Sequence, residues 1–378
     1  MSNTNLTIGF ARRGYSVSGG AEAYLKRLAR GLVDLGHKVL LLTTTDWPES
    51  DWPFGEIRHV RARSPMGFAE ELEVLRKGMP MDVLMSLERV LSCDVYRAGD
   101  GVHRAWLERR AAMEKPWQRL ARRLNPKHQD LLRLEKILLD DRGAERVIAN
   151  SQMVKSEIVD FYQYRPDRID VIHNGVPLQD FQFHQAIREK ARADLGLSAD
   201  ELGILFVGSG WARKGLRFAI EAVESIKDRK LRLVVAGRGT PADFPSRAAR
   251  FLGEVAQVGP LYAAADMFIL PTAYDPFSNA SLEALASGLP VITTRANGFS
   301  EVMEDKIHGS IIEQPHDVAA LRQAIELWSD STRRSAARSA ILKRASQFDI
   351  ATNVEKTIAV LLQAAADADA RSGKMRKT

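Results

Sequence analysis

Cysteine is the scarcest residue type in this sequence. Cys93 is the one cysteine among 378 residues, so no disulfide can form within the chain. Small secreted domains that depend on disulfides are therefore excluded as a class, and a reducing compartment fits this composition. The chain is also longer than one hydrophobic core usually serves, so we expect two domains.

Long hydrophobic runs are missing as well. The first residues, MSNTNLTIGFARRG, lack a basic start followed by an apolar stretch, which argues against a secretory signal. No window offers the roughly 18 uncharged apolar residues that a membrane-spanning helix requires. We therefore expect a cytoplasmic protein.

Positive charge is in moderate excess. Lys and Arg number 54 against 48 Asp and Glu, which gives a formal net charge of +6 and a pI near 9.4. The hydrophobic share of 45% and the charged share of 27% are ordinary for a soluble globular protein. The basic balance favours anionic partners, and by itself it leaves nucleotides, phosphorylated lipids and nucleic acid open.

The first half of the sequence alternates strand and helix patterns. Leu6–Phe10 is typical of a short buried strand, and Ala23–Leu35 has apolar residues at helical spacing until Gly36 ends the helix. Lys38–Thr44 is a continuous apolar run of the kind found in parallel sheets, so the first 45 residues predict a β-α-β unit. Further predicted strands are Val83–Leu87, Val95–Ala98, Arg146–Ala149 and Ile169–Ile172.

The second half repeats this alternation after a change of pattern near residue 180. The predicted helices are Gln185–Leu195, Leu216–Ile226, Asn279–Ser287 and Asp317–Trp328. The predicted strands are Gly203–Val207, Leu231–Ala236, Met267–Leu270 and Val291–Thr294. We therefore expect an N-terminal acceptor domain over 1–180 and a C-terminal nucleotide-binding domain over 181–348. A C-terminal helix and frayed tail follow over 349–378, and packing back on the N-terminal domain is one option for them.

Alternation in both halves predicts an α/β fold with two facing Rossmann-like, doubly wound domains. Ligands of such sheets bind beyond the carboxyl ends of the strands. We therefore expect the site in the cleft between the two domains.

One candidate motif is FVGSGWARKG, Phe206–Gly215, in which a strand leads into a glycine turn and a helix. Gly208 and Gly210 allow the backbone to approach a phosphate, and Arg213 and Lys214 place two positive charges beside it. The alternatives are an ordinary β-α turn with a solvated basic pair and a dinucleotide fingerprint. The third glycine falls too late for that fingerprint, and no acidic residue ends the following strand.

A second candidate motif is PTAYDPFSNASLEALASGLPVITT, which starts at Pro271. Its helix begins near Ser278, and we expect free amides at Asn279, Ala280 and Ser281 to accept an anion. Asp275 and Glu283 cannot bind phosphate and are better suited to accept hydrogen bonds from sugar and ribose hydroxyls. Taken singly, Asp275 is also explained as a turn former before proline, and Glu283 as a surface charge.

Together these motifs resemble the family-4 retaining glycosyltransferases of the two-domain GT-B type. The family signature is an acidic residue, seven residues and a glutamate, which here reads Asp275-PFSNASL-Glu283 and is followed by ALASGLPVI. The resemblance extends over nearly the whole chain through SGGAE, SQMVKSEI, VIHNGV, VGSGWARKG, FLGEV and LYAAADMFILP. It is strongest with the enzymes that add glucose or related sugars to the inner core of lipopolysaccharide.

This chain departs from the family pattern at two positions. Many relatives have arginine where Ser209 stands, so the resemblance assigns the phosphate charge to Arg213 and Lys214. The first acid of the signature is normally glutamate and is here Asp275, which is one methylene shorter. With this departure, the resemblance leaves the exact transferred sugar open.

The resemblance implies a set of site residues. The catalytic candidates are Asp100, His103, Arg213, Lys214 and Asp275, of which Asp100 and His103 lie on a loop that touches the transferred sugar. The donor-binding candidates are Gly19, Gly20, Gly208, Ser209, Arg213, Lys214, Gly253, Glu254, Leu261, Asp275, Phe277, Ser278, Asn279, Ala280 and Glu283. Among these, Gly253, Glu254 and Leu261 are expected near the base, and Glu22 is placed loosely near the acceptor.

The segment Arg104–Lys136 contains ten Lys or Arg against four Asp or Glu, together with Trp106 and Trp117. Basic residues mixed with tryptophans suit an anionic membrane surface. A solvated helix pair and a nucleic-acid patch are the competing interpretations, and no RNA- or DNA-binding module accompanies the segment. We expect a peripheral position on the inner face of the cytoplasmic membrane and no nucleic-acid partner.

No metal or cofactor is expected, because no D-x-D follows a strand in a suitable context. The expected substrates are a nucleoside diphosphate sugar, with UDP-glucose first, and a lipopolysaccharide-core or other lipid-linked glycan. Retention at the anomeric carbon is implied by the resemblance alone. The alternatives are a sugar-nucleotide 2-epimerase of the same fold and a non-catalytic nucleotide-binding module at a membrane.

Overall fold

The computed structural model describes residues 5–16, 20–111, 114, 116–227 and 230–372. The chain divides into two compact units. The first consists of Met1–His173 together with Ala351–Thr378, and the second of Asn174–Ile350. The sequence predicts domain boundaries near residue 180 and after residue 348. In the structure, the two units are divided between residues 173 and 174 and between residues 350 and 351.

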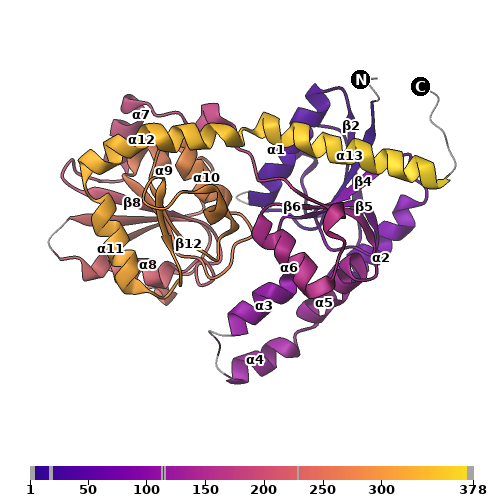
Figure 1. Ribbon diagram of the computed structural model, residues 1–378, viewed down its shortest axis with the longest axis horizontal. Helices are drawn as coiled ribbons and strands as arrows, with labels where there is room; N and C mark the ends of the chain where they lie inside the picture. The colour runs from indigo at the N-terminus through magenta and orange to yellow at the C-terminus, as the bar shows by residue number, and fades with distance from the viewer. Residues whose placement is uncertain (1–4, 17–19, 112–113, 115, 228–229, 373–378) are drawn as a thin grey trace. The chain divides into compact units, whose positions relative to one another are not determined.

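The first unit is built on a parallel sheet of seven strands in the order β3-β2-β1-β4-β5-β6-β7. Helices lie on both faces of this sheet (Figure 1). The strands are β1 (Thr7–Arg12), β2 (Lys38–Thr44), β3 (Glu56–Val60), β4 (Val83–Ser86), β5 (Cys93–Ala98), β6 (Ala144–Ala149) and β7 (Ile169–Val171). The helices are α1 (Gly20–Asp34), α2 (Pro65–Arg76), α3 (His103–Ala111), α4 (Pro116–Arg123), α5 (Pro126–Leu139), α6 (Gln152–Tyr162) and α13 (Ile350–Ser372).

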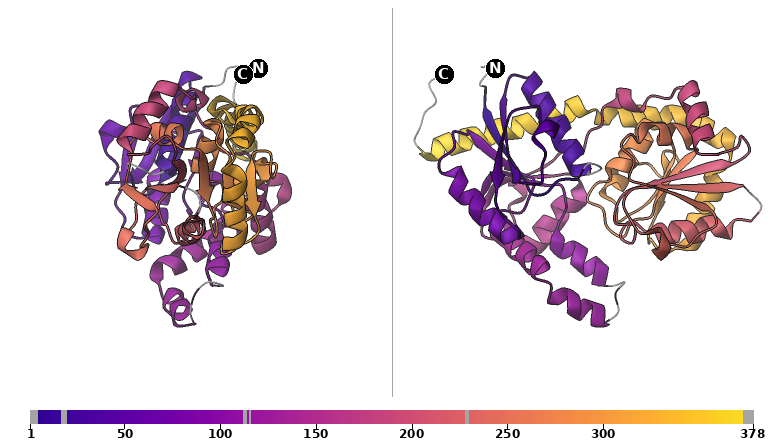
Figure 2. Two further views of the ribbon diagram at one scale, coloured as in Figure 1. Left: turned by 90° about the vertical axis from the view of Figure 1, so that its left-hand side faces the viewer. Right: turned by 180° about the vertical axis from the view of Figure 1, so that it is seen from behind.

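The second unit contains a parallel sheet of six strands in the order β10-β9-β8-β11-β12-β13. Helices again cover both faces (Figure 2). The strands are β8 (Leu202–Val207), β9 (Leu231–Ala236), β10 (Ala249–Gly253), β11 (Met267–Leu270), β12 (Val291–Thr294) and β13 (Gly309–Ile312). The helices are α7 (Gln185–Asp194), α8 (Leu216–Ser225), α9 (Gly259–Ala264), α10 (Asn279–Ala286), α11 (Val318–Trp328) and α12 (Ser331–Ala345).

Short 3₁₀ helices occupy several connections between these elements. They are η1 (Glu49–Asp51), η2 (Pro166–Arg168), η3 (Leu178–Phe181), η4 (Pro241–Asp243), η5 (Gly298–Val302) and η6 (Ser346–Phe348).

Both sheets have the doubly wound, parallel arrangement that the sequence predicts. The central strands are buried on both faces because helices cover them, which explains continuous apolar runs such as KVLLLTT in β2. Side-chain caps mark where several helices begin: the hydroxyls of Ser64 and Ser151 each accept a hydrogen bond from the first turn of α2 and α6. The α/β fold with two Rossmann-like units is therefore confirmed.

Hydrogen bonds join the two chain crossings within each unit. In the second unit, the Val176 N–H donates to the Phe348 carbonyl, and the Ile350 N–H donates to the Val176 carbonyl, each at 3.1 Å. In the first unit, the buried Asn353 donates its side-chain amide to the His173 carbonyl at 2.7 Å. The segment that leaves the first unit and the segment that returns to it therefore lie side by side.

Candidate active site

The two glycine-containing motifs of the second unit meet at the carboxyl edge of its sheet. One follows β8 and the other follows β11, and these strands are parallel neighbours. The Ala273 N–H donates to the Arg213 carbonyl at 2.8 Å, and the Thr272 hydroxyl donates to the same oxygen at 3.1 Å. This contact fixes the basic pair of the first motif against the acidic loop of the second.

Gly215 makes the close approach possible. It precedes α8 with φ of +76°, and a Cβ atom at this position would lie 1.9 Å from the Pro271 carbonyl oxygen. Any other residue would push the two motifs apart. The sequence pattern identifies this glycine as part of a turn, and the structure adds its role in joining the motifs.

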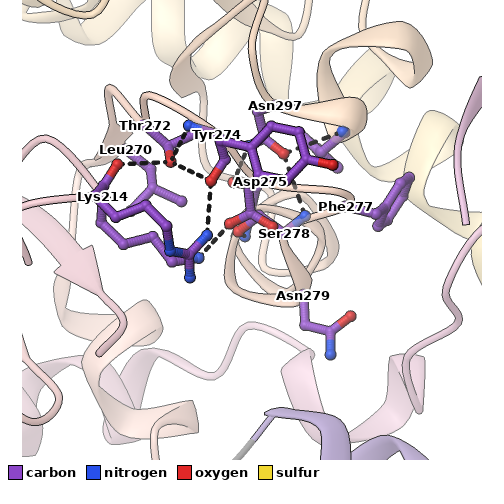
Figure 3. A network of polar contacts seen from close by, with 12 residues as sticks. Lys214, Leu270, Thr272, Tyr274, Asp275, Phe277, Ser278, Asn279 and Asn297 are labelled. Carbon is purple, nitrogen blue, oxygen red and sulfur yellow. Dashed lines mark hydrogen bonds and ion pairs between the residues drawn. The ribbon is translucent and has the colours of Figure 1, made fainter. Parts of the chain in front are cut away.

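Lys214 and Asp275 form a buried ion pair at the centre of this edge (Figure 3). Only 12% of the lysine side chain and 7% of the aspartate side chain are exposed. Burial lowers the pKa of Lys214, although the Asp275 carboxylate opposes this shift. Next to the pair, Arg213 donates from Nη1 to the Tyr274 carbonyl at 2.6 Å.

Asn297 anchors the loop that carries Asp275, and the sequence analysis did not identify it. Its side chain is fully buried, and Oδ1 accepts from the Ser278 and Phe299 amides at 3.2 and 3.1 Å. Its Nδ2 donates to the Thr293 hydroxyl at 3.0 Å. One amide group therefore ties the start of α10 to the end of β12, a role that only the three-dimensional arrangement reveals.

The N-terminus of α10 is partly satisfied within the protein. The Ser278 hydroxyl caps the helix by accepting from the Ser281 amide at 3.2 Å. The expectation of a free amide at Ser281 is therefore wrong, because the capping side chain occupies it. At Asn279 the side-chain oxygen accepts from Asn174 Nδ2 at 2.5 Å, and the same donor lies 3.4 Å from the Phe277 carbonyl.

Glu283 lies one turn into α10 and is half-buried. The Tyr262 hydroxyl on α9 donates to Glu283 Oε2 at 3.0 Å and to the Ala280 carbonyl at 3.2 Å. The carboxylate is thus oriented by a tyrosine that the sequence analysis did not single out. Glu283 is not a freely solvated helix charge.

The glycine turn after β8 is organised around Trp211. The indole N–H donates to the Gly208 carbonyl at 2.9 Å, and the Ser209 hydroxyl accepts from the Arg238 amide at 3.2 Å. Gly210, with φ of +73°, has open space where a Cβ atom would lie. The turn therefore presents a small, open backbone surface at the carboxyl edge.

The residues expected near the base divide into two groups. Gly253 ends β10, and the exposed Glu254 follows it with its carboxylate 3.9 Å from Arg238 Nη1. Leu261 lies elsewhere, because its side chain is packed in the hydrophobic core of the second unit. This side chain supports α9 by packing and offers little surface to a ligand.

In the first unit, Glu22 and Asp100 converge on one arginine. Arg12, the last residue of β1, lies 3.1 Å from the Glu22 carboxylate and 3.5 Å from that of Asp100. The same guanidinium contacts Glu88 at 2.7 Å. Half of the Asp100 side chain is exposed, at 52%, so this carboxylate remains accessible at the carboxyl edge of the sheet. Neither Arg12 nor Glu88 belongs to a sequence motif.

His103 does not lie on a loop as expected. It is the first residue of α3 and is buried, and its Nε2 lies 3.1 Å from Nδ1 of His128 on α5. Burial, together with the nearby Arg89 charge, lowers the pKa of His103 to about 4.

Of the glycines expected near the donor phosphate, Gly20 begins α1 and Gly19 lies outside the described residues.

The basic segment folds into α3, α4 and α5. Trp117, Leu120 and Leu124 are 66%, 60% and 69% exposed, whereas Trp106 is half-buried. Part of the positive charge is neutralised locally, because Glu114 pairs with both Arg110 and Arg122 at 2.5 and 2.8 Å. The segment therefore exposes apolar side chains that the charge count did not reveal.

Two absences hold for the described residues. No group of three His, Cys, Asp or Glu side chains is close enough together to hold a metal ion. No described helix combines the length and the apolar character needed to cross a bilayer.

Known families and proteins match this chain in sequence. Residues 201–330 match the family described as glycosyl transferases group 1, and residues 98–180 match glycosyltransferase family 4. A probable transglycosylase of Burkholderia thailandensis is 30% identical over 384 residues, which cover 97% of this chain and 99% of the relative. The lipopolysaccharide glucosyltransferase WaaG of Escherichia coli is 26% identical over 345 residues, which cover 85% of this chain and 88% of WaaG.

Solved structures share the fold. The crystal structure of WaaG, a glycosyltransferase involved in lipopolysaccharide biosynthesis, has a TM-score of 0.81 at 22% identity and covers 94% of this chain and 99% of that one. Anabaena HepE in complex with UDP-glucose has a TM-score of 0.75 at 20% identity, and the match covers 94% of this chain and 100% of HepE.

Proposed function

This chain belongs to the glycosyltransferases of group 1 and family 4, and we propose that it transfers a hexose from UDP-glucose to a lipopolysaccharide-core or other lipid-linked glycan. The transfer of a sugar follows from family membership. The diphosphate site and the membrane surface are proposals that rest on particular residues, whereas the sugar donor and the acceptor are proposed from the relatives.

The observation that carries the proposal is the position of Arg213 and Lys214 against the loop that leads into the N-terminus of α10. Two cations and a helix N-terminus at one sheet edge form a favourable environment for a diphosphate. Charge accumulates on the departing diphosphate as the glycosidic bond breaks, so these groups act most strongly in the transition state. They supply this stabilisation from the protein's own side chains, and we propose that no metal is needed.

Asp275 holds Lys214 in place until the donor binds. The buried pair is stable only because each charge compensates the other. An incoming diphosphate offers Lys214 a second anion, and the Asp275 oxygens then become available to sugar hydroxyls. Glu283, oriented by Tyr262, is suited to a ribose hydroxyl in the same way.

UDP-glucose is proposed on the basis of the relatives. HepE has been crystallised with UDP-glucose, and the Escherichia coli relative is named as a glucosyltransferase. The second of these names also suggests lipopolysaccharide as the acceptor. Retention at the anomeric carbon is proposed from the family resemblance.

Membrane attachment is proposed for α4. Trp117, Leu120 and Leu124 are spaced so that they share one side of a helix, and all are exposed. Exposed Arg119, Lys127 and Arg133 add positive charge to this part of the chain. An apolar helix side with basic neighbours favours shallow insertion into an anionic membrane, at the cytoplasmic face where a lipid-linked acceptor is accessible.

Incubation with UDP-, GDP- and ADP-linked sugars, with and without a core oligosaccharide released from lipopolysaccharide, tests the proposal. We expect glucose transfer that depends on the acceptor and is detected as a mass increase of one hexose. Isomerisation of the donor without acceptor would indicate the 2-epimerase instead. Donor binding without turnover would indicate a nucleotide-binding module.

A further inference from the structure

Residues 13–16, which follow β1, and residues 45–48, which follow β2, form a corner at the carboxyl edge of the first sheet. These strands are parallel neighbours and end at Arg12 and Thr44. The Gly14 amide in the first connection donates to the Thr44 hydroxyl at 2.8 Å. The corner lies at the same sheet edge as Glu22 and Asp100, both of which contact Arg12.

Tyr15 is fixed in this corner at three points. Its backbone N–H donates to Asp46 Oδ2 at 3.1 Å, and its hydroxyl donates to Asp51 Oδ2 at 2.6 Å. Its ring packs edge-on against Trp47 with the centroids 5.2 Å apart. Tyr15 as a whole is half-buried, so the residue is partly accessible to solvent while these contacts fix its orientation.

A buried layer supports the tyrosine from below. Trp47 is 1% exposed and contacts Trp52, which is 3% exposed, at a centroid distance of 6.0 Å. Lys26 of α1 donates to the same Asp51 oxygen at 2.9 Å. Burial acts against the Asp51 charge, but the hydrogen bonds from Lys26 and Tyr15 keep the pKa of this carboxyl below its usual value.

The hydroxyl of Tyr15 stays protonated over the working pH range. Its hydrogen bond to Asp51 raises the pKa of Tyr15 to about 12. The tyrosine is therefore a neutral aromatic ring whose polar end is already engaged. Its hydroxyl proton is already donated to Asp51, so the ring and the acceptor lone pairs of the oxygen are what Tyr15 can offer a ligand.

A rigid aromatic side chain on a surface loop is suited to binding. Loops are usually mobile, and binding is weaker when the ligand must first order a mobile side chain, because this ordering costs conformational entropy. Tyr15 has already lost this freedom in folding. The face of an aromatic ring carries partial negative charge, which attracts the C–H groups on one face of a pyranose ring. The exposed Asp46 beside it offers acceptor oxygens for hydroxyl groups.

We propose that Tyr15 is a stacking residue for a pyranose ring of the acceptor glycan, held in position by Asp46, Asp51 and Trp47. This inference rests on the proposed function, because it requires a glycan acceptor. It places the acceptor saccharide at the carboxyl edge of the first sheet, within the connections that follow β1 and β2. Asp100 at the same edge is available for further hydroxyl contacts.

Steady-state kinetics of Tyr15→Ala and Tyr15→Phe with UDP-glucose and the core oligosaccharide test this inference. We expect the alanine variant to raise the acceptor KM about fivefold to tenfold, because the loss of one aromatic contact weakens binding by roughly that much. Tyr15→Phe keeps the ring and should stay within about twofold of the wild type. Hydrolysis of UDP-glucose without acceptor should be unchanged in both variants.

Phe54→Ala is the matched control. Phe54 packs on Trp52 at a centroid distance of 5.1 Å, so its loss disturbs the same aromatic layer. It lines a groove with Thr7 and Lys38 at the amino ends of the strands, at the opposite edge of the sheet. The acceptor KM of this variant should equal that of the wild type.

Saturation-transfer NMR on the core oligosaccharide supplies a readout that a merely structural residue would not change. We expect the saccharide C–H signals to be strong with the wild type and with Tyr15→Phe, and weak with Tyr15→Ala. An unchanged acceptor KM in a folded Tyr15→Ala variant would overturn the inference while leaving the proposed function intact. Equal effects of Tyr15→Ala and Phe54→Ala would also overturn it. Absence of transfer by the wild type would instead refute the proposed function.

Discussion

Lys214 and Asp275 are paired across two loops of the second unit, and both side chains are withdrawn from solvent. In the proposed diphosphate site, Lys214 acts only while it keeps its proton. Its pKa reflects a balance between burial, which lowers it, and the Asp275 carboxylate, which raises it. The aspartate therefore controls the pH range in which the lysine is charged.

Replacement of Asp275 by asparagine should shift the alkaline limit of activity to lower pH. Without the carboxylate, burial is no longer opposed and the pKa of Lys214 falls further, so the lysine loses its proton earlier as the pH rises. The measurement is the pH profile of kcat/KM for the donor. Glu283→Gln is the control, because Glu283 contacts Tyr262 and not Lys214. If the pH at which kcat/KM falls on the alkaline side is the same in Asp275→Asn and the wild type, Asp275 does not set the pKa of Lys214.

Arg213→Ala and Lys214→Ala should lower kcat at least as much as they weaken donor binding. Their charge acts on the diphosphate chiefly as it leaves, and the loss of one such group lowers turnover by about 100-fold in comparable sites. Steady-state kinetics together with calorimetric titration of the donor separate the two effects. If both variants stay within about twofold of the wild type in kcat and in donor affinity, the assignment of the diphosphate site is wrong.

The burial of His103, together with the nearby Arg89 charge, predicts a loss of stability in acid. The pKa of His103 falls from an ordinary value of 6.5 to about 4 on folding, so the unfolded chain binds a proton more readily than the folded one. The free energy of unfolding should therefore decrease as the pH falls from about 6.5 toward about 4, by roughly 3 kcal/mol for this group. Urea unfolding at several pH values measures this slope.

His103→Gln should make that slope shallower, whereas His184→Gln should not, since His184 is an exposed side chain. Equal slopes in the wild type and His103→Gln would show that this histidine gains no proton on unfolding in that range.

Membrane attachment should depend on the exposed apolar side chains of α4 and of Leu124, which directly follows it. Replacing Trp117, Leu120 and Leu124 by serine removes the apolar side of the helix, and Arg119→Glu removes charge that contributes on the order of 1 kcal/mol near an anionic surface. Both changes should reduce sedimentation with anionic liposomes. Attachment should also weaken with salt, because the Debye length of about 8 Å at physiological ionic strength shortens as salt is added.

Activity on the delipidated oligosaccharide is the control for these variants and should be preserved. Arg122→Glu is a less informative change, because Arg122 is only 12% exposed and pairs with Glu114. Equal attachment of the wild type to neutral and anionic liposomes would argue that charge has no part in it.

Much of the fold could be predicted from the sequence because the central strands are buried on both faces. Met267–Leu270 and Val291–Thr294 match the observed strands in full, since their apolar runs have clear ends. The strands that the sequence pattern does not predict, β3, β10 and β13, are all at sheet edges. In β3 the sequence EIRHV buries only Val60 fully, so partial exposure interrupts the apolar run.

The candidate site was predictable where a motif is local and unpredictable where partners are distant in sequence. Arg213, Lys214 and Asp275 belong to short motifs with glycines or prolines nearby, and the fold brings them together. Arg12 and Glu88 lie 76 positions apart and carry no motif, so their contact requires the register of β1 and β4. The roles of the predicted site residues in binding and catalysis stay predictions.

The neighbouring chain crossings have a consequence for engineering. Val176 bonds to both Phe348 and Ile350, so the two ends of the second unit meet, and this unit is one uninterrupted segment inserted into the first. A single cassette, residues 174–350, can therefore be exchanged between relatives in a chimera with two adjacent junctions. If specificity for the sugar nucleotide resides in residues 174–350, a chimera will have the donor specificity of the protein that supplies this segment. Its acceptor specificity will be that of the protein that supplies the first unit.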